Sequence, residues 1–302
     1  MTKNAAPKPD VYTRITNQII AALEAGTKPW TQPWQASHAA GGVSRPLRFN
    51  GEAYSGINVL TLWASAMERR LAAPIWMTFK QAIELGGCVR KGETGSPVVY
   101  ANSIKRTETD PDTGQDEERA IPFLKAYTVF NVEQIDGLPA HYYALATGST
   151  NPDQRIAAAE AFFQATGAEI HHGGNSACYI PSLDRIHMPQ FEAFRDAESY
   201  YATLTHEVTH WTRHDRRLAR DFGRERWGDA GYAQEELVAE LGAAFLCADL
   251  KITLSERNDH ASYIASWLKV LKNDNKAVFT AAAHAQRAVD FLHGKQAERL
   301  AA

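Results

Sequence analysis

Residues 205–210 read THEVTH, with two histidines four positions apart and a glutamate directly after the first. In an α-helix, side chains four positions apart lie on one face about 5–6 Å from each other, so His206 and His210 can direct ring nitrogens at one metal ion. Glu207 lies beside them, where it can take a proton from a water that the metal polarises. The alternative is a polar helix face with two hydrogen-bonded histidines, because so short a pattern recurs by chance.

The third metal ligand must come from outside this hexapeptide. Metzincins place a third histidine six residues after the second, and Arg216 occupies that position here, which excludes the class. His214 follows His210 by four residues but lies nearly a turn further along, which favours a supporting or structural role. Residues 234–247, QEELVAELGAAFLC, predict a helix that offers three carboxylates. They belong to Glu235, Glu236 and Glu240.

Two of these glutamates share a helix face that becomes apolar further along. Glu236 and Glu240 occupy positions i and i+4, and positions i+7 and i+11 are alanine and cysteine, so this is more than a solvated side. The alternative is a pair of acidic residues near a helix N-terminus, where the helix dipole favours them. The spacing resembles the ExxxD pattern of gluzincins, which implies Glu236 as the third ligand and Glu240 as the carboxylate that orients a ligand histidine. The order of the two glutamates stays open.

The strand pattern before the metal-binding helix is a second feature of the site. Residues 177–189, ACYIPSLDRIHMP, read as a strand, a turn and a strand. A strand at this place fits the edge of a zincin cleft, where an extended peptide substrate can pair with it. The alternative is an ordinary hairpin that takes no part in the chemistry.

The composition is that of a soluble globular protein of 302 residues, 44% hydrophobic and 22% charged. The chain has no run of 18 apolar residues and no apolar leader at its start, which predicts a cytoplasmic protein without membrane insertion. Its three cysteines are scattered and form no CxxC pair, so neither a disulfide framework nor a cysteine zinc site is expected. Residues 1–107 hold 13 Lys and Arg against 6 Asp and Glu, and residues 151–302 hold 17 against 21. This asymmetry favours a polyanionic partner for the first part.

Residues 146–154, ATGSTNPDQ, give the best linker signal and predict domains at 1–148 and 149–302. The first domain reads as helices, one of them at 76–87, followed by two strands joined by an acidic tip at 107–120. The second reads as helices with a strand–turn–strand. The predicted fold class is α+β: an N-terminal domain of helices plus an antiparallel sheet, followed by a zincin-like, mainly helical metallopeptidase domain with a small sheet.

The first domain carries basic and aromatic residues that suit single-stranded nucleic acid. Proteins that bind such strands combine a positive groove along the backbone with aromatic rings on which bases stack. The alternative for each aromatic residue is a place in the core, and the chain has no RRM, KH, helix-turn-helix or zinc-finger pattern. The DNA-binding residues predicted on this chemistry are Lys28, Trp30, Trp34, Arg45, Arg48, Tyr54, Lys80, Arg90 and Lys91.

The ordered set of motifs resembles one family, the ArdC-type antirestriction proteins. Four stretches are similar to that family's amino-terminal domain, and a similar domain occurs at the front of the TraC plasmid primases. They are IIAALEAGTKPWTQPW (19–34), NGEAYSGINVLTLW (50–63), WMTFKQAIELGGCVRKGETGSPVVY (76–100) and AYTVFNVEQIDGL (126–138). The stretches TLTHEVTHWTRHDRRLAR (203–220) and YAQEELVAELGAAFL (232–246) are similar to its zincin-like domain.

This resemblance implies a plasmid-encoded protein that binds single-stranded DNA and protects incoming DNA from host restriction during conjugation, with passage into the recipient cell as a further option. It implies a peptidase that uses Zn²⁺, or Mn²⁺ or another divalent ion, on a protein substrate such as a host restriction component. Two other hypotheses stay open. One is a DNA-shielding protein with a structural, inactive zincin domain, and the other is a metallopeptidase whose first domain binds protein.

Overall fold

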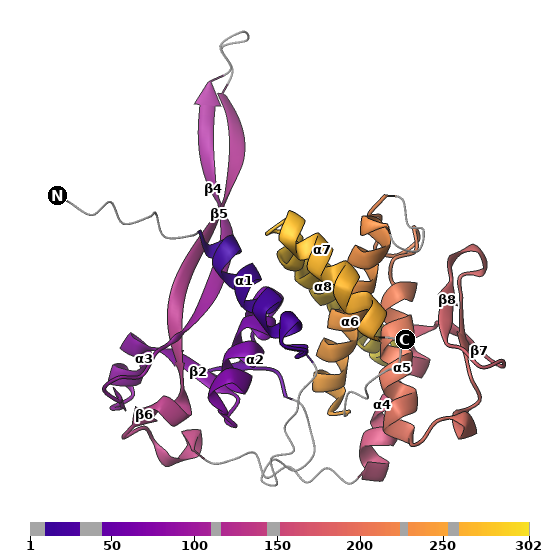
Figure 1. The fold of residues 1–302 in the computed structure, drawn as a ribbon, viewed down its shortest axis with the longest axis horizontal. Coiled ribbons are helices and arrows are strands. Elements are labelled where there is room, and N and C mark those ends of the chain that lie inside the picture. The colour runs from indigo at the N-terminus through magenta and orange to yellow at the C-terminus, as the bar shows by residue number, and fades with distance from the viewer. Residues whose placement is uncertain are drawn as a thin grey trace.

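A computed structural model of the chain describes residues 10–30, 44–109, 116–143, 152–223, 229–252 and 260–301. Figure 1 shows an amino-terminal part with a sheet and a long two-stranded ribbon, beside a carboxy-terminal part of packed helices with a small sheet at its outer side. This is the α+β architecture that the sequence predicts. Residues 146–151 of the predicted linker lie outside the described residues, so the boundary between two domains stays a prediction.

The amino-terminal part is built on a four-stranded sheet. Its elements are α1 (Val11–Glu24), β1 (Leu47–Arg48), α2 (Ile57–Arg69), β2 (Ile75–Thr78), α3 (Phe79–Glu84), β3 (Cys88–Val89), β4 (Ser96–Thr109), β5 (Asp116–Asn131), β6 (Ile135–Asp136) and the 3-10 helices η1 (Val132–Gln134) and η2 (Ala140–Tyr142). The strand order is β1-β2-β5-β4, in which β1 and β2 run parallel and the other pairs antiparallel. Strands β3 and β6 form a separate antiparallel pair.

Two sequence predictions in this part are corrected by the structure. The helix predicted at 76–87 is wrong for its first three residues, because Ile75–Thr78 form β2 and pair with β5 inside the sheet. Thr78 then begins α3 through a capping box with Gln81. The ribbon strands run on to Thr109 and start again at Asp116, so they include most of the segment predicted as a tip loop.

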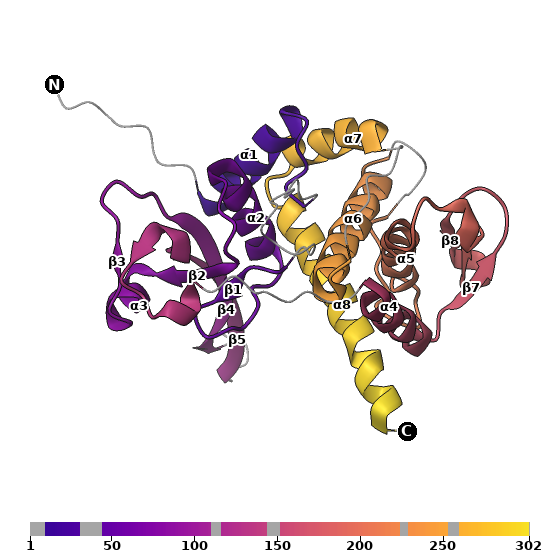
Figure 2. The same cartoon turned by 90° about the horizontal axis from the view of Figure 1, so that it is seen from below.

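The carboxy-terminal part consists of helices around α6. Its elements are α4 (Pro152–Thr166), β7 (Glu169–His172), β8 (Cys178–Ile180), η3 (Pro181–Leu183), β9 (Arg185–Met188), η4 (Phe191–Ala193), α5 (Ala197–Trp211), α6 (Ala230–Leu250), α7 (His260–Asn273) and α8 (Ala277–Ala301). The small sheet has the order β7-β9-β8, so β8 is an edge strand. Helix α6 is buried all round because α5, α7 and α8 cover it (Figure 2). Across the described stretches, we find no helix with the length and hydrophobicity of a membrane span.

The two parts share one hydrophobic core. Figure 2 shows α1 beside α7, and two ring pairs join the parts, one on α7 and the other between α2 and α6. The centroids of the Trp30 and Trp267 rings lie 5.7 Å apart, and those of Trp63 and Phe245 lie 6.0 Å apart. All four side chains are buried. The amino-terminal part therefore completes the core of the helical part.

An ion pair between a buried arginine and a half-buried aspartate also joins the two parts. Arg45 donates two hydrogen bonds to the carboxylate of Asp249, at 2.7 and 2.9 Å, and a third to Gln286 at 2.8 Å. Its guanidinium lies 4.9 Å from the ring centroid of Phe245. A bidentate pair of this kind fixes orientation as well as distance, so it holds the segment before β1 in one orientation against the end of α6.

Candidate metal centre

The helix that carries the two histidines is α5, as the hexapeptide predicts. It begins at Asp196, whose carboxylate accepts a hydrogen bond from the Ser199 backbone N–H at 2.7 Å. Hydrogen bonds from Ser199 and Arg195 lower the pKa of Asp196 to about 2, so the cap is charged at neutral pH. The helix is thereby fixed at its N-terminus, with the histidines in its last two turns.

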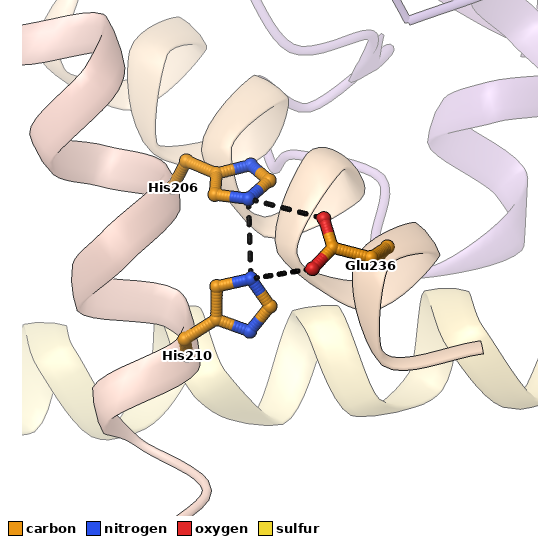
Figure 3. A group of neighbouring side chains, drawn as sticks. All are labelled: His206, His210 and Glu236. Atoms are coloured by element: carbon orange, nitrogen blue, oxygen red, sulfur yellow. Dashed lines mark hydrogen bonds and ion pairs between the residues drawn. The ribbon is translucent and has the colours of Figure 1, made fainter. Parts of the chain in front are cut away.

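Three side chains converge between α5 and α6 (Figure 3). The Nε2 atoms of His206 and His210 lie 3.1 Å apart. The Glu236 carboxylate places one oxygen 3.6 Å from the first of these nitrogens and the other 3.5 Å from the second. Two imidazoles and a carboxylate at this spacing are a ligand set for a divalent metal ion.

Helix α6 brings Glu236 to the histidines because the two helices approach closely at Gly242. A Cβ atom on Gly242 would lie 2.5 Å from Cγ2 of Thr209, so any side chain there would force the helices apart. One turn further along the contact, the Thr205 hydroxyl lies 3.5 Å from the Cys247 sulfur. The metal site therefore depends on the absence of a side chain at one position of α6.

A second carboxylate holds His210 from behind. The Nδ1 atom of His210 lies 3.0 Å from Oε1 of Glu235, and both oxygens of Glu235 accept hydrogen bonds from Arg220, at 2.7 and 2.8 Å. This arrangement fixes the imidazole ring and leaves Nε2 facing the metal site. The sequence offers Glu235 only as one of three possible ligands. It does not indicate Arg220, because the turn after α5 brings this residue back to Glu235.

The support behind His206 is different. Its Nδ1 atom lies 3.7 Å from Oε1 of Glu240, which is an ion-pair distance longer than a hydrogen bond. The other oxygen of Glu240 accepts a hydrogen bond from the indole N–H of Trp30 at 3.4 Å. Glu240 thus lies near His206, and its role in orienting this histidine stays a prediction. His214 lies beyond the end of α5, and in the described part of the chain it makes no hydrogen bond to either metal-site histidine.

A cleft of about 380 Å³ opens in front of the three ligands. Edge strand β8 forms one wall, and the backbone N–H of Tyr179 in that strand donates to a carboxylate oxygen of Glu207 at 2.9 Å. On another wall, the hydroxyls of Tyr232 and Tyr263 lie 3.0 Å apart. Burial raises the pKa of Tyr232, so its hydroxyl stays protonated and can donate a hydrogen bond to a ligand. The sequence does not mark the two tyrosines.

Comparison with known proteins identifies the chain. Residues 9–130 match the family model described as the N-terminal domain of anti-restriction factor ArdC, and residues 157–284 match a zincin-like metallopeptidase family. The metal-free crystal structure of the antirestriction protein ArdC from plasmid R388 is 46% identical, with a TM-score of 0.80 over 96% of this chain and 99% of that one. The chain belongs to the ArdC antirestriction family.

Other proteins similar to this chain agree with the family assignment. The Mn(II)-bound crystal structure of R388 ArdC is 44% identical, with a TM-score of 0.78 over the same share of both chains. The protein y4eC of Sinorhizobium fredii is 42% identical over 99% of this chain and 97% of its own length. The DNA primase TraC of Escherichia coli is 38% identical over 95% of this chain, which spans only 27% of that primase. The Mn(II)-bound relative agrees with a divalent metal site in the ArdC fold.

The predicted DNA-binding residues divide into a buried and an exposed group. Those with less than a tenth of their surface exposed are Lys28, Trp30, Arg45 and Tyr54. Burial leaves these four no open face for a base or a phosphate. The exposed ones are Arg48, Lys80, Arg90 and Lys91. Trp34 lies outside the described residues, and DNA contact by the exposed group stays a prediction.

The carboxylates around His210 control its protonation. Burial by itself would lower the pKa of His210, but Glu236 and Glu235 raise it to about 10. The pKa of Glu235 is lowered to about 2, because Arg220 and His210 outweigh the opposing effect of burial. In the metal-free protein His210 therefore stabilises the fold fully below its ordinary pKa of about 6.5, and this contribution is lost as pH rises through about 10.

We predict that Mn²⁺ binding at pH 8 releases about one proton per ion, because the metal must displace the proton of His210. Calorimetric titrations in two buffers of different ionisation enthalpy measure this number. The apparent affinity should rise about tenfold per pH unit between about pH 7 and 9. A titration that releases no proton at pH 8 would contradict the raised pKa of His210.

Proposed function

We propose that this ArdC-family protein is a metal-dependent peptidase that also binds single-stranded DNA, and that it protects incoming DNA from host restriction during conjugation. The observation that carries the peptidase assignment is the place of Glu207. This carboxylate is 3% exposed, follows a ligand histidine directly, and is held by the backbone of an edge strand that lines the cleft. A buried carboxylate in this position is suited to move a proton.

Each residue of the cleft has a separate role in the proposed hydrolysis of a peptide bond. A divalent ion held by His206, His210 and Glu236 would supply the positive charge that polarises a peptide carbonyl and a water. Glu207 accepts the proton of the attacking water and passes it to the amine that leaves when the C–N bond breaks. The Tyr232 hydroxyl can donate a hydrogen bond to the carbonyl oxygen as negative charge develops on it.

The substrate of this centre is an extended segment of a protein. Strand β8 is the edge of its sheet and lines the cleft, so a peptide can add to the sheet and pass the metal site in a fixed register. A host restriction component remains a candidate substrate by its role, and no residue of the cleft selects it.

We predict that Glu207→Gln retains the metal and lowers peptide hydrolysis at least about 100-fold, since amide and carboxylate have the same shape but the amide takes no proton. Hydrolysis of an unfolded protein and metal content are measured together. The control is Glu192→Gln, which changes an exposed carboxylate of η4 outside the cleft. A wild-type protein that hydrolyses nothing with Mn²⁺ or Zn²⁺, or a Glu207→Gln variant of full activity, contradicts the peptidase. Full protection of DNA by Glu207→Gln in cells would favour the shielding hypothesis.

Binding to single-stranded DNA is supported by the family and by the basic excess of residues 1–107. We predict that the protein binds a single-stranded oligonucleotide more tightly than a duplex of the same length. The affinity should fall at least about tenfold between about 50 and 200 mM salt, because bound phosphates release counterions. Fluorescence anisotropy over a salt series measures both. Binding that is absent or insensitive to salt would favour a first domain that contacts protein.

A further inference from the structure

Strands β4 and β5 form a ribbon that projects beyond the rest of the molecule (Figure 1). Their pairing is continuous from Ser96 opposite Val129 to Thr109 opposite Asp116. Strand β2 pairs with β5 only at the inner end, so the outer ribbon has two strands. Residues 100–105 of β4 are all exposed, so side chains on both faces of this stretch are open to contact with a partner.

One face of this ribbon gathers aromatic and apolar side chains. Residues directly opposite each other in an antiparallel pair point to the same face, and every second residue of a strand does so too. By this register one face carries Tyr100, Ile104, Ile121, Phe123, Lys125 and Tyr127, which we name the arm face. Four of them are exposed by 39 to 59%, and they make up four of the nine exposed large hydrophobic residues in the described segments.

Positive charges flank the rings of the arm face. Lys125 is exposed and lies directly opposite Tyr100 in the ribbon. At the inner end, the Arg48 guanidinium lies 5.5 Å from the ring centroid of Tyr54. Arg48 pairs with Trp76 and Trp76 with Asn131 in the sheet, so Arg48 lies on the same sheet face as Tyr127. Arg48 and Lys125 thus lie on the same face of the sheet as the rings of Tyr127, Phe123 and Tyr100.

We propose that the arm face is the single-stranded DNA-binding surface, with bases stacked on Tyr100, Phe123 and Tyr127 and phosphates held by Lys125 and Arg48. The inference rests on the proposed binding of single-stranded DNA and adds the surface that performs it. Ring faces can receive only unstacked bases, so the partner is a single strand rather than a duplex. Side chains two apart along a strand are about 6.8 Å apart, which gives successive bases separate platforms. An exposed apolar ribbon without a partner would be an aggregation hazard.

The double variant Tyr100→Ala/Tyr127→Ala tests this surface in the full-length protein. We expect its affinity for a single-stranded 30-mer to fall roughly 30-fold or more, because each stacked base is lost separately. Lys125→Gln should reduce the slope of log affinity against log salt by about 0.7. The control is Phe191→Ala, which removes an exposed ring from the opposite part of the molecule and should leave DNA affinity unchanged.

The outcomes separate this surface from the proposed function. If wild type binds single strands and the double variant binds equally well, the arm face is excluded while DNA binding stands. If the double variant loses duplex and single-strand affinity to the same extent, stacking on single strands is overturned. If wild type binds no single strands at all, DNA binding itself fails. An unchanged melting temperature of the variants shows that they are folded, so a loss of DNA affinity is then assigned to the arm face.

An independent observation concerns the metal site. Trp30 belongs to the amino-terminal part, is 1% exposed, and packs its ring on Trp267. Its indole N–H donates to one oxygen of Glu240, whose other oxygen faces Nδ1 of His206. We infer that Trp30 is a positioning residue for the metal centre, because it holds the carboxylate that lies 3.7 Å from Nδ1 of a ligand histidine.

Trp30→Phe keeps the packing and removes the N–H donor. We expect it to weaken Mn²⁺ binding about tenfold in calorimetric titrations. The matched control is Trp63→Phe, since Trp63 is equally buried but donates to the Ser44 carbonyl oxygen at 3.2 Å, away from the site. In a Glu240→Ala background, Trp30→Phe should cause no further loss of Mn²⁺ affinity.

Three results would overturn the inference. They are an unchanged Mn²⁺ affinity in Trp30→Phe, an equal loss in Trp63→Phe, and a full additional loss on top of Glu240→Ala. A merely structural role predicts similar melting temperatures of the metal-free Trp30→Phe and Trp63→Phe variants and similar Mn²⁺ affinities as well. A positioning role predicts similar melting temperatures of the two variants but a lower Mn²⁺ affinity only in Trp30→Phe.

Discussion

The close approach of α5 and α6 at Gly242 is the contact on which the site depends. Thr209 occupies the volume that a side chain at this position would need. At this separation a short glutamate side chain from α6 reaches the ring nitrogens of two histidines on α5. The same approach sets Glu235 and Glu240 behind those rings, one for each histidine. When metal ligands come from two helices, the packing between the helices determines how precisely the ligands are placed.

The two ligand histidines are supported from different parts of the chain. Behind His210, Glu235 is locked by Arg220, which follows α5 within the same part of the molecule. Behind His206, Glu240 is held by Trp30, which comes from the amino-terminal part. The carboxylate behind one histidine is therefore held within the carboxy-terminal part, and the carboxylate behind the other is held across the two parts. If Trp30 acts as we infer, the metal centre depends on both parts of the chain.

Helical periodicity was enough to predict His206 and His210 as a pair, because four residues along one helix need no knowledge of the rest of the fold. Glu236 required a second helix and a resemblance to gluzincins. The contacts of Arg220 and Trp30 with the glutamates behind the histidines could not be predicted from the sequence. The position of Arg220 follows from a turn of the chain, and that of Trp30 follows from packing between distant segments. The same limit explains why Arg45 is predicted as a DNA-binding residue. Its guanidinium suits a phosphate, but its partner in the structure is Asp249, which lies 204 residues away in the sequence. At Ile75–Thr78, pairing in the sheet outweighed a helix-like pattern.

The shared core has a consequence for how this protein can be inherited. Rings of the amino-terminal part fill the space between helices of the carboxy-terminal part, so neither half keeps a complete interior when the other is removed. Recombination that separates them would leave apolar faces open on both sides. The match to TraC covers 95% of this chain within a primase of which it is 27%. The region of the primase that matches this chain thus includes both parts together, as expected if the two parts are exchanged between genes as one unit.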